Sequence, residues 1–268
     1  MAILNLTPDS FSDGGRHSLD PAQVVQTVRR MVEDGAQIID IGGQSSRPNA
    51  VEVSVEEEID RVIPAIKAIR QAGLTVPISI DTYRAKVAEA AIRAGGDIIN
   101  DVSAGTLDSE MLSTAAVLNV PVILMHMRGT PQTMNALTTY DGDLIEVIGR
   151  ELRERVEEAI KLGIRRWNII LDPGLGFAKT GLHNIEIMRR LNELRRQPGL
   201  SGMPWLLGPS RKSFIERITG EKVAEERLWG TAGAVAACVQ GGADIIRIHD
   251  VGEMAKVVKM SDAIWRDV

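Results

Sequence analysis

Short apolar runs alternate along the whole chain with longer amphipathic stretches. The runs lie at Ala2–Asn5, Ile38–Ile41, Ile78–Ile80, Ile98–Ile99, Val122–Met125, Asn168–Leu171, Trp205–Leu207 and Ile245–Ile248. Most are rich in β-branched residues and do not alternate with polar ones, as is typical of parallel strands covered on both faces. Seven helical stretches separate the runs and an eighth follows the last. This order predicts the α/β class and, within it, a single closed (β/α)8 barrel.

Helix boundaries fit the same plan. Asp20 followed by Pro21 predicts a helix N-cap with proline in the first turn. Apolar spacing predicts a long helix over 143–162. Helices are expected to end at four glycines, Gly35, Gly73, Gly95 and Gly163. The alternative fold, an open doubly wound sheet, would carry a GxGxxG turn after its first strand, and the sequence has none.

Composition narrows the class of protein. The 268 residues suit one barrel of roughly 250 residues. A net charge of -5 without long runs of one sign does not indicate a nucleic-acid partner. No apolar stretch is long enough for a membrane span and no secretory signal is visible, so a cytoplasmic or organelle-matrix location is expected. Cys238 is the only cysteine, which excludes an internal disulfide and favours a buried thiol.

Polar residues end nearly every apolar run, where a barrel places its working groups. They are Asn5, Asp40, Asp81, Asn100–Asp101, His126, Asp172, Ser210–Lys212 and Arg247–His249. Capping or turn formation explains any single one equally well. It explains the whole row less well, because each group costs desolvation energy unless it has a partner.

The row contains two chemical types. One supplies acceptors and suits a ring with several N–H groups, such as a pterin: Asp81, Asn100 and Asp172. The other supplies donors and positive charge and suits an anion such as phosphate: Arg47, Arg247 and His249. Lys212 can serve either type, because its ammonium group is a mobile point charge.

The three phenylalanines, Phe11, Phe177 and Phe214, all follow predicted strands. Their position suggests that a flat apolar ring is gripped at the barrel mouth, with local loop packing as the alternative. Two long connections, 6–20 and 42–54, are expected to be binding loops.

Metal ligation rests on one residue. Asn5 offers a hard oxygen, and Mg²⁺ binds through a few protein oxygens together with substrate phosphates. No cluster resembles a zinc site. His17, His126 and His183 are interpreted as surface or loop histidines, whereas His249 shares a strand face with Arg247.

Seven motifs in order resemble those of the dihydropteroate synthase family along essentially the whole chain. They are ILNLTPDSFSDGG, DIGGQSSRPNA, SIDTYR, IINDVSAG, LDPGLGF, GPSRKSFI and IIRIHDV. The resemblance implies a TIM barrel that condenses 6-hydroxymethyl-7,8-dihydropterin pyrophosphate with p-aminobenzoate in folate biosynthesis. The products are 7,8-dihydropteroate and pyrophosphate, and sulfonamides compete with p-aminobenzoate in this family.

The resemblance also implies residue roles. The pterin would contact Asp81, Asn100, Met125, Asp172, Lys212 and Arg247. The pyrophosphate side, with Asn5 as the Mg²⁺ ligand, would comprise Asn5, Ser46, Arg47, Arg247 and His249. The p-aminobenzoate pocket would comprise Phe11, Pro48, Phe177, Lys212 and Ser213. Catalysis would depend on Asp172, Lys212, Arg247 and His249, with pyrophosphate leaving before the amine attacks, and Asp40 would tether the first long loop.

Some features depart from the common family pattern. Gln44, Ser46 and Glu216 replace the usual glutamate, threonine and glycine. The RPNA form and the start of the first strand at residue 2 resemble eukaryotic enzymes in which this domain is the last part of a multifunctional folate protein. A naturally minimal chain and a domain excised from a longer protein are both compatible with these features. A eukaryotic origin would allow a mitochondrial location. The family commonly forms homodimers through barrel helices. Two alternatives remain, a methyltetrahydrofolate-dependent methyltransferase and a catalytically silent scaffold barrel.

Overall fold

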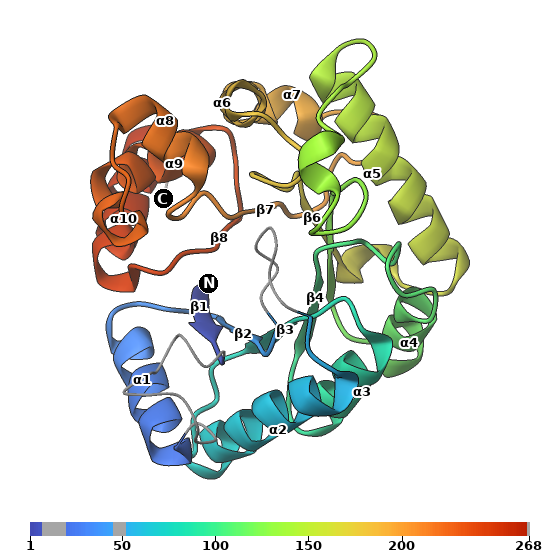
Figure 1. Cartoon of the computed structure of the whole chain (residues 1–268), viewed down its shortest axis with the longest axis vertical. Helices are drawn as coiled ribbons and strands as arrows, with labels where there is room; N and C mark the ends of the chain where they lie inside the picture. The colour runs from blue at the N-terminus through green and yellow to red at the C-terminus, as the bar shows by residue number, and fades with distance from the viewer. Residues whose placement is uncertain (7–19, 45–51, 267–268) are drawn as a thin grey trace.

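Eight parallel strands surround a central axis and the helices pack outside them (Figure 1). The computed structural model describes residues 1–6, 20–44 and 52–266. Six strands form one sheet in chain order: β1 (Ala2–Asn5), β2 (Ile39–Gly42), β3 (Ile78–Asp81), β4 (Ile98–Asp101), β5 (Val122–Met125) and β6 (Ile169–Asp172). β7 (Leu206–Leu207) pairs with β8 (Ile245–Ile246). Single bridges from Ala2 to Ile248 and from Leu171 to Trp205 join the two sheets at both edges, which confirms the predicted closed barrel.

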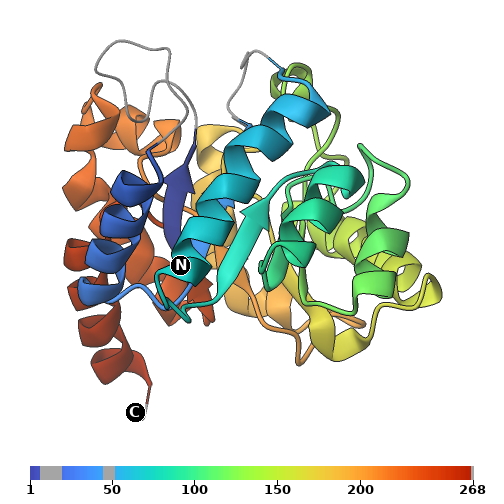
Figure 2. The same ribbon diagram turned by 90° about the horizontal axis from the view of Figure 1, so that it is seen from below.

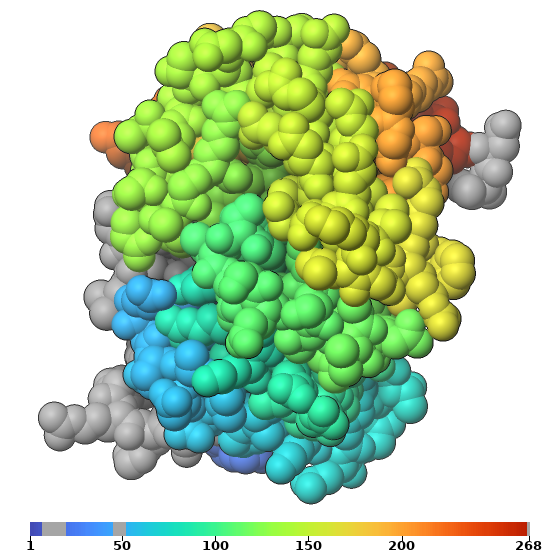
Figure 3. All heavy atoms as spheres, turned by 90° about the vertical axis from the view of Figure 1, so that its right-hand side faces the viewer, coloured from blue at the N-terminus to red at the C-terminus, as the bar shows by residue number. Residues whose placement is uncertain are grey.

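The helices keep the predicted rhythm, with two additions. They are α1 (Pro21–Glu33), α2 (Val55–Gln71), α3 (Ala85–Arg93), α4 (Met111–Leu118), α5 (Leu144–Lys161), α6 (Gly181–Arg189), α7 (Leu191–Arg195), α8 (Ser213–Thr219), α9 (Leu228–Gln240) and α10 (Val251–Trp265). Three short 3-10 helices lie at Met134–Ala136, Arg166–Asn168 and Ala224–Glu226. Two helices follow β6 and two follow β7, because Arg190 leaves helical geometry and Gly220, at φ 80°, ends α8. Figure 2 shows the helices flanking the strands from the side, and α3, α4 and α5 form one continuous outer face in Figure 3.

The predicted helix boundaries are confirmed. The Asp20 carboxylate accepts a hydrogen bond from the Ala22 amide, with Pro21 as the first helical residue. Asp143 caps the long helix α5 in the same way. The four predicted stop glycines all have positive φ: Gly35, Gly73, Gly95 and Gly163. Cys238 is buried, as expected. Within the described ranges, no helix is both long and apolar enough to cross a membrane.

The barrel interior has an apolar layer below a polar one. One core cluster consists of strand residues without helix partners, so it fills the inside of the barrel: Ile98, Ile123, Ile170 and Leu206. Side chains alternate between the two faces of a strand, so residues two positions further along point inward as well. These are Asn100, Met125 and Asp172, together with Asp40 and Arg247 above the partly buried Ile38 and Ile245. Asn5 and Asp81 also point inward, because their neighbours Leu4 and Ile80 belong to the core cluster that includes α1 and α2.

Several strand ends differ from the predicted ones by a residue or two. β3, β4 and β6 include Asp81, Asp101 and Asp172 as their last residues, because the hydrogen-bonded ladder continues to those positions. β8 is shorter than predicted, since Ile248 makes only the isolated bridge to Ala2. The acceptors Asp81, Asn100 and Asp172 are therefore held on strands, which fixes their positions, whereas Arg247 follows the shortened β8.

Candidate functional site

Arg247 lies at the centre of the polar layer and joins three strands. Its Nε donates to Asp40 Oδ2 and its Nη2 donates to Asp81 Oδ2, both at 2.6 Å. Asp40 is fully buried and Asp81 is 8% exposed, so both ion pairs lie out of bulk water. Burial raises the pKa of Asp81 to about 7, although the Arg247 charge opposes the shift. A guanidinium between two carboxylates keeps this part of the barrel polar without leaving a buried charge unpaired.

Asn100 is oriented by the same carboxylate. Its Nδ2 lies 3.2 Å from both oxygens of Asp40 and donates to them. The amide oxygen of Asn100 therefore points away from Asp40 and provides an acceptor in the buried polar layer. Asp40 therefore sets the geometry of both Asn100 and Arg247. The motif pattern suggested only that Asp40 tethers the first long loop, and that loop lies outside the described residues.

Asp172 supplies a third buried carboxylate, on the opposite side of the barrel. It pairs in register with Met125 on β5, and its Oδ1 accepts a hydrogen bond from the Gly174 amide at 2.7 Å. Burial raises the pKa of Asp172 to about 6, with the Gly174 amide, Lys212 and Lys179 opposing the shift. The carboxyl is consequently poised to change protonation state near neutral pH.

Lys212 and Phe177 meet beside this carboxylate. The Lys212 ammonium nitrogen lies 4.3 Å from the centroid of the Phe177 ring. Gly176, at φ 81°, allows the approach, because a Cβ there would lie 3.1 Å from Lys212 Cδ. Lys212 is the N-cap of α8 and the exposed Ser213 is its first residue. The two motifs DPGLGF and GPSRKSFI thus form one corner of the site.

His249 is oriented by Ser210. The Ser210 Oγ accepts from the His249 backbone amide at 3.2 Å and forms a hydrogen bond of 3.0 Å with the ring Nδ1. Where the hydroxyl donates to Nδ1, a neutral His249 carries its proton on Nε2. These two contacts fix the position of the ring after β8.

Arg211, the residue before Lys212 in the SRK motif, is engaged in an ion pair. Its guanidinium donates from Nε and Nη2 to the two carboxylate oxygens of Asp250, with a distance of 3.1 Å from Nε to Oδ2. Its backbone φ of 60° turns the chain at this point. Arg211 therefore cross-links the SRK and RIHDV segments, and Lys212 alone of the two adjacent cations lies beside Phe177.

Asn5 ends β1 with its side chain inside the barrel. A Cβ placed on Gly42 would lie 3.9 Å from Asn5 Oδ1 and 3.7 Å from Asp81 Oδ2, so the missing side chain keeps this space open. Within the part of the chain that the structure describes, no three His, Cys, Asp or Glu side chains gather as a metal site. A single neutral amide oxygen beside an anion site fits Mg²⁺, which retains waters and substrate oxygens as ligands.

Two sequence-based interpretations were wrong. Phe214, expected at the barrel mouth, is 3% exposed and packs in the core between the barrel and its outer helices. It begins the apolar face of α8 instead of lying in a loop. His126, expected in a loop or on the surface, does lie in the loop after β5, but it is 4% exposed, and its ring lies between Lys179 and Glu151, so the surface alternative is wrong. Lys179 was missed, although it follows Phe177 by two residues in the loop after β6.

Five predicted residues lie outside the described ranges. They are Phe11, His17, Ser46, Arg47 and Pro48. The segments beside the second gap are well connected: Gln44 Oε1 accepts from the Val53 amide at 2.8 Å, as a glutamate oxygen would. The other unusual residue, Glu216, pairs with Arg227 at 2.5 Å. Neither substitution removes a group from the polar layer.

Comparison with known proteins agrees with this geometry. Residues 1–249 match the family model described as "Pterin binding enzyme". Folic acid synthesis protein fol1 of Pneumocystis carinii is 54% identical over all of this chain, which covers 36% of that protein. The Schizosaccharomyces pombe counterpart is 53% identical over 98% of the chain and 36% of its own length, so the chain spans about a third of these relatives. The dihydropteroate synthase of Synechocystis sp. is 51% identical over 99% of this chain and 90% of its own.

Solved structures give the same picture. FolP (dihydropteroate synthase) from Clostridium difficile, crystallised in the presence of pteroic acid, has a TM-score of 0.91 and 42% identity over 99% of this chain and 96% of its own. The dihydropteroate synthase of Xanthomonas albilineans in complex with 7,8-dihydropteroate has a TM-score of 0.86 and 36% identity, over 100% of this chain and 93% of its own.

Proposed function

Because the chain belongs to the pterin binding enzymes and, among them, to the dihydropteroate synthases, we propose that it condenses 6-hydroxymethyl-7,8-dihydropterin pyrophosphate with p-aminobenzoate. The products would be 7,8-dihydropteroate and pyrophosphate. One observation carries the proposal. Three buried acceptors, Asp81, Asn100 and Asp172, face the inside of the barrel, and Arg247 joins their layer through ion pairs.

The acceptors suit the pterin ring. Asp172 and Asp81, ionised, would accept its N–H groups, and the oriented Asn100 amide would supply a further acceptor. Met125, on the inner face of β5 beside Asp172, offers a flexible apolar surface for the ring plane. Because the raised pKa of both carboxyls reflects burial, binding a ring that donates to them would favour their ionised forms.

Departure of pyrophosphate is the step that this site assists most. The Arg247 guanidinium and the Nε2–H of His249 would stabilise the negative charge that develops on the leaving group. Arg47 and Ser46, outside the described residues, would add to this side. Asn5 would hold Mg²⁺, which supplies positive charge to the pyrophosphate when bound.

We infer an ionisation-first displacement. Loss of pyrophosphate leaves a carbocation on the pterin methylene, which the ring electrons and the nearby Asp172 carboxylate would stabilise. The aniline nitrogen of p-aminobenzoate then attacks the carbocation and releases one N–H proton to water or to the departing pyrophosphate, so no side chain has to act as nucleophile. Phe177, Lys212 and Ser213 would form the described part of the p-aminobenzoate pocket, with Phe11 and Pro48 completing it.

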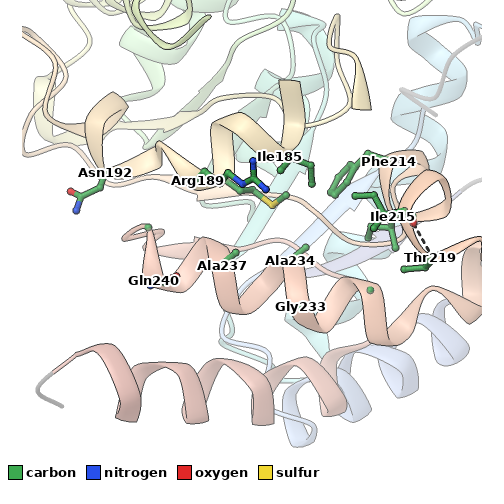
Figure 4. Close-up of a pocket in the computed structure, with 14 residues that line it drawn as sticks. Ile185, Arg189, Asn192, Phe214, Ile215, Thr219, Gly233, Ala234, Ala237 and Gln240 are labelled. Carbon is green, nitrogen blue, oxygen red and sulfur yellow. Dashed lines mark hydrogen bonds between the residues drawn. The ribbon is translucent and has the colours of Figure 1, made fainter. Parts of the chain in front are cut away.

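A second copy of the chain is the partner we propose. An apolar groove of about 500 Å³ runs between α6, α8 and α9 on the outside of the barrel (Figure 4). Large apolar side chains on these helices are exposed: Leu182 80%, Ile218 65% and Trp229 84%. We expect Trp229→Glu to yield monomers in sedimentation velocity. Trp167→Glu, at a tryptophan that is 75% exposed and does not lie on α6, α8 or α9, should not alter the mass, and a monomeric wild type would refute the proposal.

Product analysis tests the proposed function. The chain is incubated with both substrates and Mg²⁺, and 7,8-dihydropteroate is quantified by mass spectrometry. A sulfonamide should inhibit competitively with p-aminobenzoate. Methyl transfer from methyltetrahydrofolate in place of dihydropteroate formation would favour the methyltransferase alternative, and no product with either substrate set would favour the scaffold.

A further inference from the structure

Lys179 is a buried cation that the proposed chemistry does not use. The residue is 8% exposed and follows the DPGLGF segment. Its Nζ lies 2.9 Å from His126 Nδ1, 3.3 Å from the His126 carbonyl oxygen and 2.9 Å from the Phe177 carbonyl oxygen. An ammonium group has three N–H donors, and these three acceptors match them. Lys179 is therefore directed at protein atoms rather than at a ligand.

The His126 ring is fixed between two charged side chains. Its Nδ1 faces Lys179, whose pKa burial lowers to about 7; while the lysine is charged it can only donate, so in that state Nδ1 is an acceptor and Nε2 carries the proton. Nε2 donates to Glu151 Oε2 on α5 at 2.8 Å. Burial lowers the pKa of His126 to about 4, with the Lys179 charge acting in the same direction. A neutral ring thus connects the lysine to a carboxylate on a neighbouring helix.

Together with further contacts, these interactions form a closed circuit around the loop that follows β6. Glu151 also accepts from Arg128, whose guanidinium carbon lies 4.0 Å from the centroid of the Tyr140 ring. The Tyr140 hydroxyl donates to the Ala178 carbonyl oxygen at 3.0 Å. Ala178 is the residue before Lys179, so the circuit returns to its starting point. Both ends of the Phe177–Lys179 segment are consequently fastened.

The backbone within this segment needs such support. Gly174, Gly176 and Ala178 all have positive φ, at 69°, 81° and 51°. That conformation is unfavourable for Ala178, which has a Cβ. The turn also lies directly on the His126 carbonyl, because a Cβ on Gly174 would collide with that oxygen. The path of residues 173–178 is therefore set by its contacts with His126 and Lys179, together with hydrogen bonds from the Gly174 amide to Asp172 and from the Gly176 amide to Asn184.

We propose that Lys179 is a positioning residue that holds the 173–178 turn, so that Phe177 lies against Lys212 and shapes the p-aminobenzoate pocket. The consequence of this role for catalysis rests on the proposed function. Asp172, which would bind the pterin, accepts one hydrogen bond from the Gly174 amide of this turn, but its position is also fixed by the ladder to β5, which does not involve the turn. Loss of Lys179 should therefore weaken the second substrate more than the first.

The test compares Lys179→Met with Tyr140→Phe, which removes only the hydroxyl at the other end of the circuit. Lys161→Met is the matched control, since Lys161 is an exposed lysine of α5 with a distant ion pair to Glu158 at 3.8 Å. Steady-state kinetics give a separate KM for each substrate. Hydrogen exchange of the 173–178 amides reports the turn without requiring activity.

We expect Lys179→Met to raise the KM for p-aminobenzoate about tenfold, the factor for losing one aromatic contact, while the KM for the pterin substrate stays within about threefold. Exchange in the turn should accelerate, and Tyr140→Phe should shift both readouts in the same direction by less. Unchanged exchange in Lys179→Met would overturn the positioning role whether or not the wild type makes dihydropteroate. Equal rises in both KM values with faster exchange would reduce it to a general structural role. A wild type without activity would refute the proposed function, and with it the assignment of the turn to p-aminobenzoate.

Discussion

Removal of Arg247 should damage stability as well as catalysis. In Arg247→Met the side-chain stem stays and the guanidinium is lost. Two charge-assisted hydrogen bonds of 2.6 Å disappear, one to a fully buried carboxylate and one to a carboxylate whose side chain is 9% exposed. Removing one partner of a buried ion pair costs about 3–5 kcal/mol, because the remaining charge has no compensation. We therefore expect a loss of about 4 kcal/mol in the free energy of unfolding at pH 8.

The pH dependence of the stability loss and a second substitution distinguish the unpaired buried charge from lost side-chain packing as its cause. Asp81, whose pKa burial already raises to about 7, can take up a proton once the guanidinium is gone, so the loss should be smaller at pH 5 than at pH 8. Adding Asp40→Asn to this variant removes one of the carboxylate charges left without a partner and should recover about 2 kcal/mol of the free energy of unfolding at pH 8. Turnover should still be about a hundredfold lower in both variants, since the donor to the leaving group is missing.

Urea unfolding followed by circular dichroism measures these differences. Arg93→Met is the control, because Arg93 forms an exposed pair with Glu89 on α3 and should cost less than about 1 kcal/mol. If Arg247→Met costs no more than this control, or if Asp40→Asn adds to the loss, the assignment of Arg247 as the counter-charge of the polar layer is wrong.

Three further outcomes follow from the same layer. Asp172→Asn should increase the free energy of unfolding in urea by about 2–3 kcal/mol at pH 8 and not at pH 4. The reason is that a carboxyl whose folded pKa is raised to about 6 contributes stability that is lost as pH rises through that value. Calorimetry should show weaker pterin binding to this variant, and lower stability at pH 8 would contradict the reasoning. The kcat/KM for the pterin substrate should fall as pH drops through about 7 to 6, since the raised pKa values of Asp81 and Asp172 lie there and both carboxyls bind N–H groups as acceptors when ionised. A pH profile that falls only near pH 4 would contradict the effect of burial on these pKa values. Chelation should lower turnover until Mg²⁺ is restored, and Asn5→Ala should need more Mg²⁺ for the same rate; an unchanged Mg²⁺ requirement would argue against Asn5 as the ligand.

The fold was predictable because local signals agreed along the chain. β-Branched runs, helix caps such as Asp20 and glycines such as Gly35 each indicate one element type. The direction of the polar strand ends was also predictable, since strand periodicity puts Asn100 and Asp172 on the same face as apolar residues two positions earlier. Composition and order therefore sufficed for the architecture and for the polar layer.

The errors arose where partners are distant in sequence. The burial of His126 depends on Lys179, 53 residues later. The adjacent cations Arg211 and Lys212 could not be told apart locally, since Arg211 pairs with Asp250, 39 residues later, whereas Lys212 lies over the Phe177 ring. Phe214 follows a strand, as expected, but the helix α8 begins one residue before it and carries it into the core. Such choices depend on tertiary contacts that no local pattern contains.

Release of pyrophosphate tests the central claim most directly. It is measured for the wild-type chain with Mg²⁺ and both substrates, and then with either substrate withheld. The account predicts sustained release only when dihydropterin pyrophosphate and p-aminobenzoate are both present, in equal amount to the dihydropteroate formed. Absence of release under these conditions, or sustained release that does not depend on p-aminobenzoate, would contradict it.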